Sequence, residues 1–231
     1  MYIRSWLSPP PLPLDAVYTP FYCEENIYLL AQSFLESNVV ISVWEPFVVF
    51  ISNTTKSVAL WNQKAAEVDG LVVWDYHVVL VLRPRPPKIQ EDAQEDELIV
   101  APTTWIYDFD SQADLPCQYE EYFSQTFPFG NEFSPKYHSL FRIVPAQVVL
   151  EQFASDRSHM LRPATSADES SEYLSPPPPY PVLCGSQAKE RRVLTNLMSS
   201  FVSMEDSTET FGNVLGLSAF VEWCSGSLTD E

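Results

Sequence analysis

Apolar residues recur at every third or fourth position between residues 24 and 36. They are Ile27, Leu30, Ala31, Phe34 and Leu35. Because an α-helix turns once in about 3.6 residues, this spacing places them on one helix face. Pro20 keeps the helix from extending far upstream. The pattern therefore predicts an amphipathic helix that begins next to Cys23.

Downstream of this helix, the pattern changes to short apolar and β-branched runs that are typical of strands. Residues 47–52 and 57–61 flank the polar segment "NTTK" and are predicted to pair as a hairpin. Residues 70–83 are long, apolar and β-branched, which predicts a central strand. Residues 103–110 and 138–146 predict two more strands.

Helical patterns follow at residues 146–154 and 187–202, and the tail that includes residues 212–223 is predicted to be irregular. Three segments are predicted to lie outside the core. They are an extended proline-rich N-terminal segment at 1–20, an acidic, proline-containing insertion loop at 84–98 and a proline-rich loop at 165–181. A helix followed by paired strands predicts one α+β domain over residues 1–231, with a mixed, largely antiparallel sheet.

Composition and charge narrow the possible partners. With 231 residues, of which 45% are hydrophobic, the chain can bury one sizeable core. The formal net charge of −18 argues against nucleic acid, since phosphate binding requires a basic surface. This charge suits a cationic partner or serves solubility alone. No apolar run is long enough to span a membrane and no secretory signal is evident, so we expect a soluble, intracellular protein.

The four cysteines are Cys23, Cys117, Cys184 and Cys224. They lie far apart and form no C-x-x-C pair, so free thiols are expected and a zinc site is not. The few glycines form no phosphate-binding loop, and no H-E-x-x-H spacing occurs. The sequence therefore predicts neither a metal nor a cofactor.

Cys23 is a candidate nucleophile because it lies at the predicted helix start. Unpaired N–H groups there stabilise a thiolate and can donate to an oxyanion. Glu24 and Glu25 act in the opposite direction, since like charge disfavours a thiolate. The alternative interpretation is that Cys23 is a packing residue.

His77 is a candidate base within the apolar run "VVWDYHVVLV". Asp108 or Asp110, in "WIYDFD", can orient its ring if the two strands are neighbours. Period-two alternation places both aspartates on one face, so it does not choose between them. Of the other histidines, His138 is predicted to be a surface or edge residue. His159 is predicted to lie in a salt-bridged turn, with a pocket-lining loop as the alternative.

Several longer strings occur in an order that resembles the protein N-terminal glutamine amidohydrolases, from about Tyr18 to Phe220. They include "YCEEN", "WDYHVVL", "IYDFD", "FASDRSHM" and "GNVLGLSAF". The resemblance implies an α-β-α sandwich of the papain/transglutaminase-like type. It implies an enzyme that converts an N-terminal glutamine of a protein to glutamate, which feeds the N-degron route of degradation. It also implies a monomer without cofactor, located in the cytoplasm and the nucleus.

The same resemblance assigns the catalytic residues to Cys23, His77 and Asp108, and so selects Asp108 over Asp110. The chain departs from the family pattern in the acidic insertion at residues 84–98 and in an expanded segment at 165–174. Both departures are loop-like and leave the three residues in place.

Selectivity for a terminal residue requires a partner for its free α-ammonium group, because a buried charge must be paired. The candidate substrate-binding residues are Glu24, Glu25, Asp75 and Asp156, each of which is otherwise a cap, strand-edge or salt-bridge residue. Two other functions remain open. One is a cysteine protease or transglutaminase-like enzyme that acts on internal residues. The other is a non-enzymatic acidic adaptor that docks through "PPPLP" and "PPPPYP".

Overall fold

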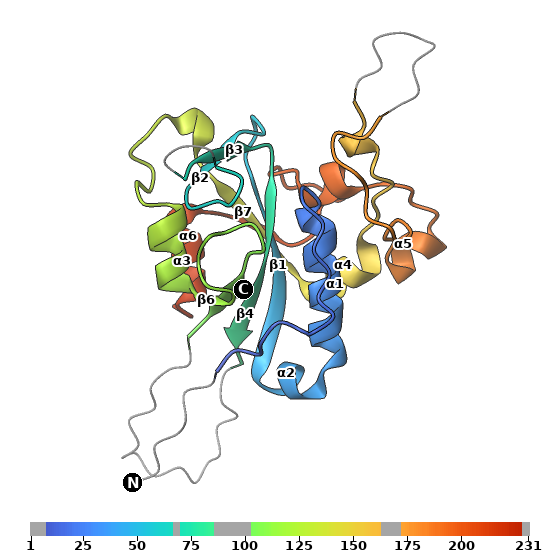
Figure 1. Ribbon diagram of the computed structural model, residues 1–231, viewed down its shortest axis with the longest axis horizontal. Helices are drawn as coiled ribbons and strands as arrows, with labels where there is room; N and C mark the ends of the chain where they lie inside the picture. Colours follow the sequence, from blue (N-terminus) through green and yellow to red (C-terminus); the bar gives the residue numbers. More distant parts are fainter. Residues whose placement is uncertain (1–7, 67–69, 86–102, 163–171, 228–231) are drawn as a thin grey trace.

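The computed structural model describes residues 8–66, 70–85, 103–162 and 172–227. These residues form an α+β domain in which helices cover both faces of a central sheet (Figure 1). The predicted α+β class is confirmed. The segment 84–98, apart from its first two residues, and residues 165–171 lie outside the described residues.

The central sheet has six strands. In spatial order they are β6 (Cys117–Gln118), β5 (Trp105–Tyr107), β4 (His77–Pro84), β1 (Trp44–Ser52), β7 (Leu140–Pro145) and β8 (Asn213–Gly216). Every pairing among these described strands is antiparallel, so the parallel component expected from the sequence is not found in them. The strands predicted at 47–52, 103–110 and 138–146 correspond to β1, β5 and β7.

Two groups of helices sandwich this sheet (Figure 1). One face carries α1 (Cys23–Glu36), α2 (Asn38–Val43) and α4 (Ala146–Gln152). The other face carries α3 (Tyr119–Thr126) and α6 (Leu217–Cys224). The helices predicted at 24–36 and 146–154 are therefore confirmed as α1 and α4. The short α5 (Ser186–Glu190) contacts α4.

Cores on both faces explain why the central strands read as continuous apolar runs. Along β4, the side chains of Val78 and Leu80 enter the core under α1, whereas Val79 and Val81 enter the core under α3 and α6. All four are at most 1% exposed. Because successive side chains point to opposite faces, a strand that is covered twice needs apolar residues at every position.

The predicted hairpin between residues 47–52 and 57–61 is wrong. β1 pairs with β4 on one side and β7 on the other, so it has no free edge for the next strand. The next strand, β2 (Val58–Leu60), instead pairs with β3 (Val72–Trp74) in a separate small sheet. Asn53 directs this exit, because its side chain bonds Thr55, Ser57 and the carbonyls of Lys136 and His138.

The single strand predicted at residues 70–83 is divided into β3 and β4 by a bend. At the bend, Asp75 Oδ1 accepts a hydrogen bond from the Tyr76 N–H at 2.9 Å, and the Asp75 carbonyl accepts one from Ser52 at 2.7 Å. The bend separates the strands into two sheets and places Trp74 through His77 around one cavity.

The C-terminal part also differs from the expectation. The predicted helix at 187–202 stops after α5, since Arg192 is left-handed (φ 57°), and a π-helical turn follows at Leu197–Phe201. The tail at 212–223 is not irregular, because it contains β8 and α6. Phe220 on α6 stacks on Phe141 of β7 with ring centroids 4.3 Å apart. Contacts between residues so far apart in the sequence cannot be inferred from a local pattern.

Of the N-terminal segment 1–20, residues 8–20 are described, and they contain no helix or strand. This segment packs on the domain, where the Tyr107 hydroxyl donates to the Pro10 carbonyl. Residues 172–181 are also loop. Within the described ranges, no helix is both long and apolar enough to cross a membrane.

Gly212 is predicted to be the glycine whose replacement destabilises the fold most clearly. It has φ +71°, and an added Cβ would lie 1.9 Å from the Ile143 carbonyl oxygen, on the strand that pairs with β8. Gly212→Ala should lower the free energy of unfolding by about 3 kcal/mol or more. Gly130 has φ +52° with nothing within 4 Å of the added Cβ, so Gly130→Ala should lose only about 1 kcal/mol. Equal losses in urea unfolding would contradict the steric argument.

Candidate active site

His77 and Asp108 form a buried pair. His77 begins β4 and Asp108 directly follows β5, so the antiparallel pairing of these strands brings the two side chains together. His77 Nε2 lies 2.8 Å from Asp108 Oδ1. Because a carboxylate only accepts hydrogen bonds, Nε2 carries a proton, and Nδ1 is an acceptor whenever the imidazole is neutral. Trp74 stacks on the imidazole with ring centroids 6.0 Å apart.

Further donors hold the Asp108 carboxylate. Tyr122 on α3 donates to Oδ2 at 2.9 Å, and the Asp110 backbone N–H donates to Oδ1 at 2.9 Å. Burial alone would raise the pKa of Asp108, but the charge and hydrogen bond of His77, with these donors, lower it. Burial likewise opposes the charged form of His77, but Asp108 raises the pKa of His77. The pair is therefore stabilised in its ionic form.

Cys23 is the first residue of α1, as the sequence predicts, and its partly exposed side chain lines the same cavity as His77. Loss of hydration, then the charges of Glu24 and Asp110, raise the pKa of the Cys23 thiol well above its ordinary value. The Val78 backbone N–H opposes this shift. Burial and the acidic surroundings together thus favour the protonated form of the sulfur.

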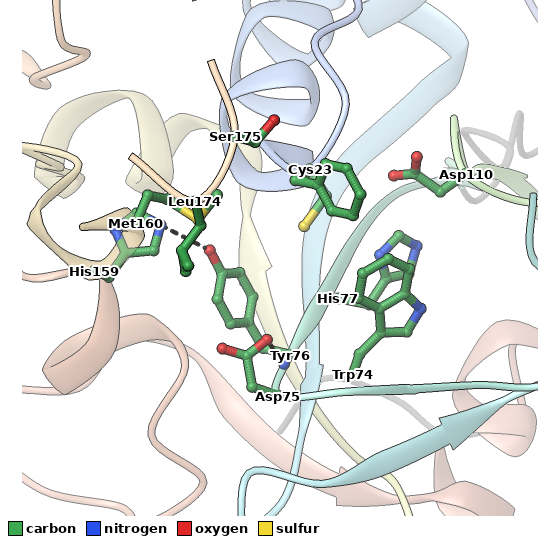
Figure 2. A pocket seen from close by; sticks show the side chains of 11 residues that line it. Cys23, Trp74, Asp75, Tyr76, His77, Asp110, His159, Met160, Leu174 and Ser175 are labelled. Atoms are coloured by element: carbon green, nitrogen blue, oxygen red, sulfur yellow. Dashed lines mark hydrogen bonds between the residues drawn. The ribbon is translucent and has the colours of Figure 1, made fainter. Parts of the chain in front are cut away.

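The thiol and the imidazole face a common space. Figure 2 shows the Cys23 sulfur pointing between the rings of Tyr76 and His77. The sulfur lies 3.8 Å from Glu24 Oε2, and no hydrogen bond joins it to His77. Contacts between a nucleophile and its base are often long in unliganded sites and shorten when substrate binds.

The cavity has a volume of about 270 Å³. Besides Cys23 and His77, its walls include the carboxylates of Asp75 and Asp110, and no described lysine or arginine lines it. Exposed apolar side chains such as Phe21 lie at its edge. A small, acidic cavity of this kind accommodates one side chain together with a positive charge.

The two glutamates after Cys23 are buried but have different partners. Glu25 accepts two hydrogen bonds from Arg157, at 2.7 and 2.8 Å, so its carboxylate is fully paired. Glu24 accepts a hydrogen bond from Tyr76 at 3.0 Å, and its Oε1 lies 3.3 Å from His159 Nε2. Neither glutamate lines the cavity.

The other two acidic candidates also differ. Asp75 is exposed and lines the cavity. Asp156 does not line it, and its Oδ1 accepts a hydrogen bond from the Ser158 N–H at 2.9 Å, as a turn-capping residue does. The structure therefore brings Cys23, His77 and Asp75 together at one cavity and leaves Asp156 outside it.

Tyr76 is a cavity residue that the sequence prediction missed, whereas His159 fits the alternative of a pocket-lining loop. The main prediction for His159, a salt-bridged turn, does not describe its contacts, because its Nε2 lies 3.3 Å from Glu24 Oε1 on α1 and its ring lines the cavity. Its Nε2 is also 3.1 Å from the Tyr76 hydroxyl. The string "FASDRSHM" was the available signal. His138 has only a structural contact, with the Phe133 carbonyl at 2.9 Å.

His77, Asp108 and Asp110 are the described residues whose donor atoms come closest to a metal-binding arrangement, within 4.8 Å of one another. Both Asp108 oxygens already accept hydrogen bonds from protein donors. The Asp108 oxygens therefore accept hydrogen bonds from the imidazole and from Tyr122, as expected of a hydrogen-bonded acid and base.

The sequence model of one protein family, described as N-terminal glutamine amidase, matches residues 18–224. The chain belongs to this family. The match spans every residue that lines the cavity, from Phe21 to Ser175, so the amidase family and the site coincide along the chain.

Relatives named protein N-terminal glutamine amidohydrolase agree with this assignment and confirm the resemblance seen in the sequence. The human protein is 34% identical over 209 residues, which cover 90% of this chain and 88% of that protein. The Arabidopsis thaliana protein is 36% identical over 205 residues, covering 87% of this chain and 82% of that protein. The Bos taurus protein is 34% identical over 210 residues, covering 90% and 87%.

The buried pair of this amidase predicts a defined pH dependence of stability. Because the pKa of Asp108 is lowered, its contribution is complete above its usual value of 3.8 and is lost as the pH falls through the folded-state pKa. Because the pKa of His77 is raised, its contribution is complete below its usual 6.5 and is lost as the pH rises through the folded-state pKa.

Asp108→Asn removes both contributions. The variant should therefore be less stable than the wild type by roughly 3 kcal/mol near pH 5, with the difference narrowing toward acid and toward base. Urea unfolding across this pH range measures the difference. Asp114→Asn, at an exposed acid nearby, serves as the control and should give a small, flat difference. A flat difference for Asp108→Asn would contradict the ionic pair.

Proposed function

We propose that the protein hydrolyses the side-chain amide of an N-terminal glutamine, giving glutamate and ammonia. The observation that carries this proposal is the single acidic cavity that contains the Cys23 thiol and the His77 ring, which is hydrogen-bonded to Asp108, in a chain of the N-terminal glutamine amidase family. A thiol, an imidazole and an orienting carboxylate are the groups that thiol-dependent amide hydrolysis uses.

In the proposed mechanism, His77 Nδ1 takes the proton of the Cys23 thiol, and the sulfur attacks the carboxamide carbon. The N–H groups at the start of α1 stabilise the oxyanion. His77 then donates the proton to the departing nitrogen, which leaves as ammonia, and a thioester remains on Cys23. Water, deprotonated by His77, hydrolyses the thioester and frees the γ-carboxylate. Asp108 keeps the imidazole oriented and stabilises its charged form.

The remaining family properties are proposals as well. A papain/transglutaminase-like fold is supported by the antiparallel sheet and by a cysteine at the start of the helix that packs on it. Action as a monomer is proposed from the family resemblance alone. A place in the cytoplasm and nucleus, where reduced cysteines persist, accords with the free thiols of Cys23, Cys117, Cys184 and Cys224. The glutamate product would feed the N-degron route.

Neither alternative function gains support. The named relatives act on N-terminal glutamine by their names, which does not favour an internal-site protease or transglutaminase. The proline segments needed by an adaptor pack on the domain. Arg157 bonds the carbonyls of Pro178 and Tyr180, and the Tyr180 hydroxyl is buried.

Cys23→Ala should reduce ammonia release from a Gln-initiated peptide by at least about 10,000-fold, because no other thiol lines the cavity of the described chain. The melting temperature should stay within a few degrees, since the change removes one partly exposed sulfur. Cys184→Ala, at an exposed cysteine outside the cavity, is the matched control and should retain full activity. Retained activity in Cys23→Ala would remove this residue from the nucleophile role.

Substrate selectivity is tested with three peptides that differ only at the first residue: Gln, Asn and Nα-acetyl-Gln. Exchange of the amide nitrogen for oxygen makes the product heavier by about one mass unit, which mass spectrometry detects. We expect this gain for the Gln peptide alone. Equal conversion of the acetylated peptide would instead indicate an enzyme that acts on internal glutamine.

A further inference from the structure

We propose that the carboxylate of Asp110 binds the α-ammonium group of the terminal glutamine, and that this pairing prepares Cys23 for reaction. The inference rests on the proposed function. It identifies the group that distinguishes a free amino terminus from a blocked one, and it links that recognition to the chemical step.

Asp110 is a buried acidic residue that no described lysine or arginine side chain pairs with. Its side chain is 8% exposed and lines the cavity. Oδ1 accepts a hydrogen bond from the Tyr18 hydroxyl at 2.7 Å, and no described donor reaches Oδ2. The nearby ammonium of Lys64 donates to the Phe109 carbonyl at 2.8 Å. A buried charge without a partner is unfavourable, so this position is suited to a bound cation.

The other acids near Cys23 are less suitable. Glu25 is fully paired with Arg157. Glu24 does not line the cavity, and it already contacts the Tyr76 hydroxyl and His159. Asp75 does line the cavity, but it is exposed, and solvent screens its charge. Asp110 is therefore the one described acid that is buried, lines the cavity and is not paired with a lysine or an arginine.

The position of Asp110 fits the length of glutamine. A carboxylate oxygen of Asp110 lies within 4.8 Å of a ring nitrogen of His77. In an extended glutamine, the α-nitrogen lies about 5 Å from the amide carbon, so an ammonium held by Asp110 keeps that carbon beside the imidazole and the thiol. Asparagine is shorter by one methylene and leaves its amide carbon more than about 1 Å short.

Pairing of Asp110 also changes the electrostatics around the sulfur. Glu24 on α1, Asp75 at the β3–β4 bend and Asp110 after β5 each oppose ionisation of Cys23. The Tyr76 hydroxyl and His159 Nε2 contact Glu24. A bound α-ammonium neutralises Asp110, so the thiol proton passes more readily to His77. An acetylated amine carries no charge, and therefore neither docks nor promotes this transfer.

The test compares Asp110→Asn with wild type on two peptides, one starting with Gln and one with its des-amino analogue, in which hydrogen replaces the α-amine. In Asp110→Asn, kcat/KM for the Gln peptide should fall on the order of 100-fold, while that for the analogue, which has no ammonium to lose, should not fall. The preference for the free amine then collapses. Asparagine keeps an acceptor for Tyr18, so the fold is retained, and Asp114→Asn, at an exposed acid outside the cavity, is the control.

A second measurement follows alkylation of Cys23 by iodoacetamide against pH, without substrate. Loss of the Asp110 charge should shift the rise in rate to lower pH, an effect that a purely structural role would not produce. An unchanged preference and pH profile, or a collapse of the preference in Asp75→Asn instead, would overturn the inference. A wild type that releases no ammonia from the Gln peptide would contradict the proposed function itself, whereas an active wild type with an equally selective Asp110→Asn contradicts only this inference.

Discussion

A buried imidazole and a buried carboxylate must satisfy each other, and this requirement ties the site to the whole sandwich. His77 is 2% exposed and Asp108 is 3% exposed, so loss of either partner leaves a polar group in the core. The pair forms because β4 and β5 are antiparallel neighbours, and it is completed by Tyr122 from α3. Cys23 arrives from α1, on the opposite face of the sheet. Three layers therefore contribute to one site.

The surroundings of Cys23 favour a protonated sulfur in the resting protein. A helix N-terminus stabilises a thiolate by a fraction of a charge, whereas Glu24, Asp75 and Asp110 present full negative charges, and the sulfur has lost much of its hydration. Loss of hydration is the largest of these effects and the charge of Glu24 is the next, and both raise the pKa of the thiol. A site of this kind limits reaction of the sulfur with oxidants and stray electrophiles, because the thiolate is the reactive species.

The local patterns of the sequence predict the helices and strands better than they predict which strands pair with one another. The 3.6-residue period of α1 and the apolar run of β4 follow from burial, because the positions in these segments that pack in the core carry apolar residues. The pairing of β1 depends on Asn53, whose side chain binds carbonyls some 85 residues away, as in its 3.0 Å bond to the His138 carbonyl. The bend at Asp75 depends on a bond from Ser52. Such contacts between distant residues leave no trace in periodicity.

The same limit applies to the site. The order of Cys23, His77 and Asp108 was visible in the sequence, together with the neighbouring strands that join the last two. The partner of His159 was not, because Glu24 lies on a different element far along the chain. Asp110 was considered only as a rival to Asp108. Period-two alternation groups the two aspartates, and only the hydrogen bonds show that one serves the imidazole while the other faces the cavity.

Glu24 and Glu25 are adjacent on α1 but bind different partners, and the bonds of Glu25 help to hold the cavity wall in place. Successive residues on a helix point about 100° apart, so Glu24 and Glu25 leave α1 in different directions. Glu25 binds Arg157, which in turn holds the carbonyls of Pro178 and Tyr180. Tyr22, next to Cys23, donates to the Ser175 carbonyl on the cavity wall at 3.1 Å. These bonds order the cavity wall before substrate binds, so binding of the amine does not have to offset the cost of ordering the wall.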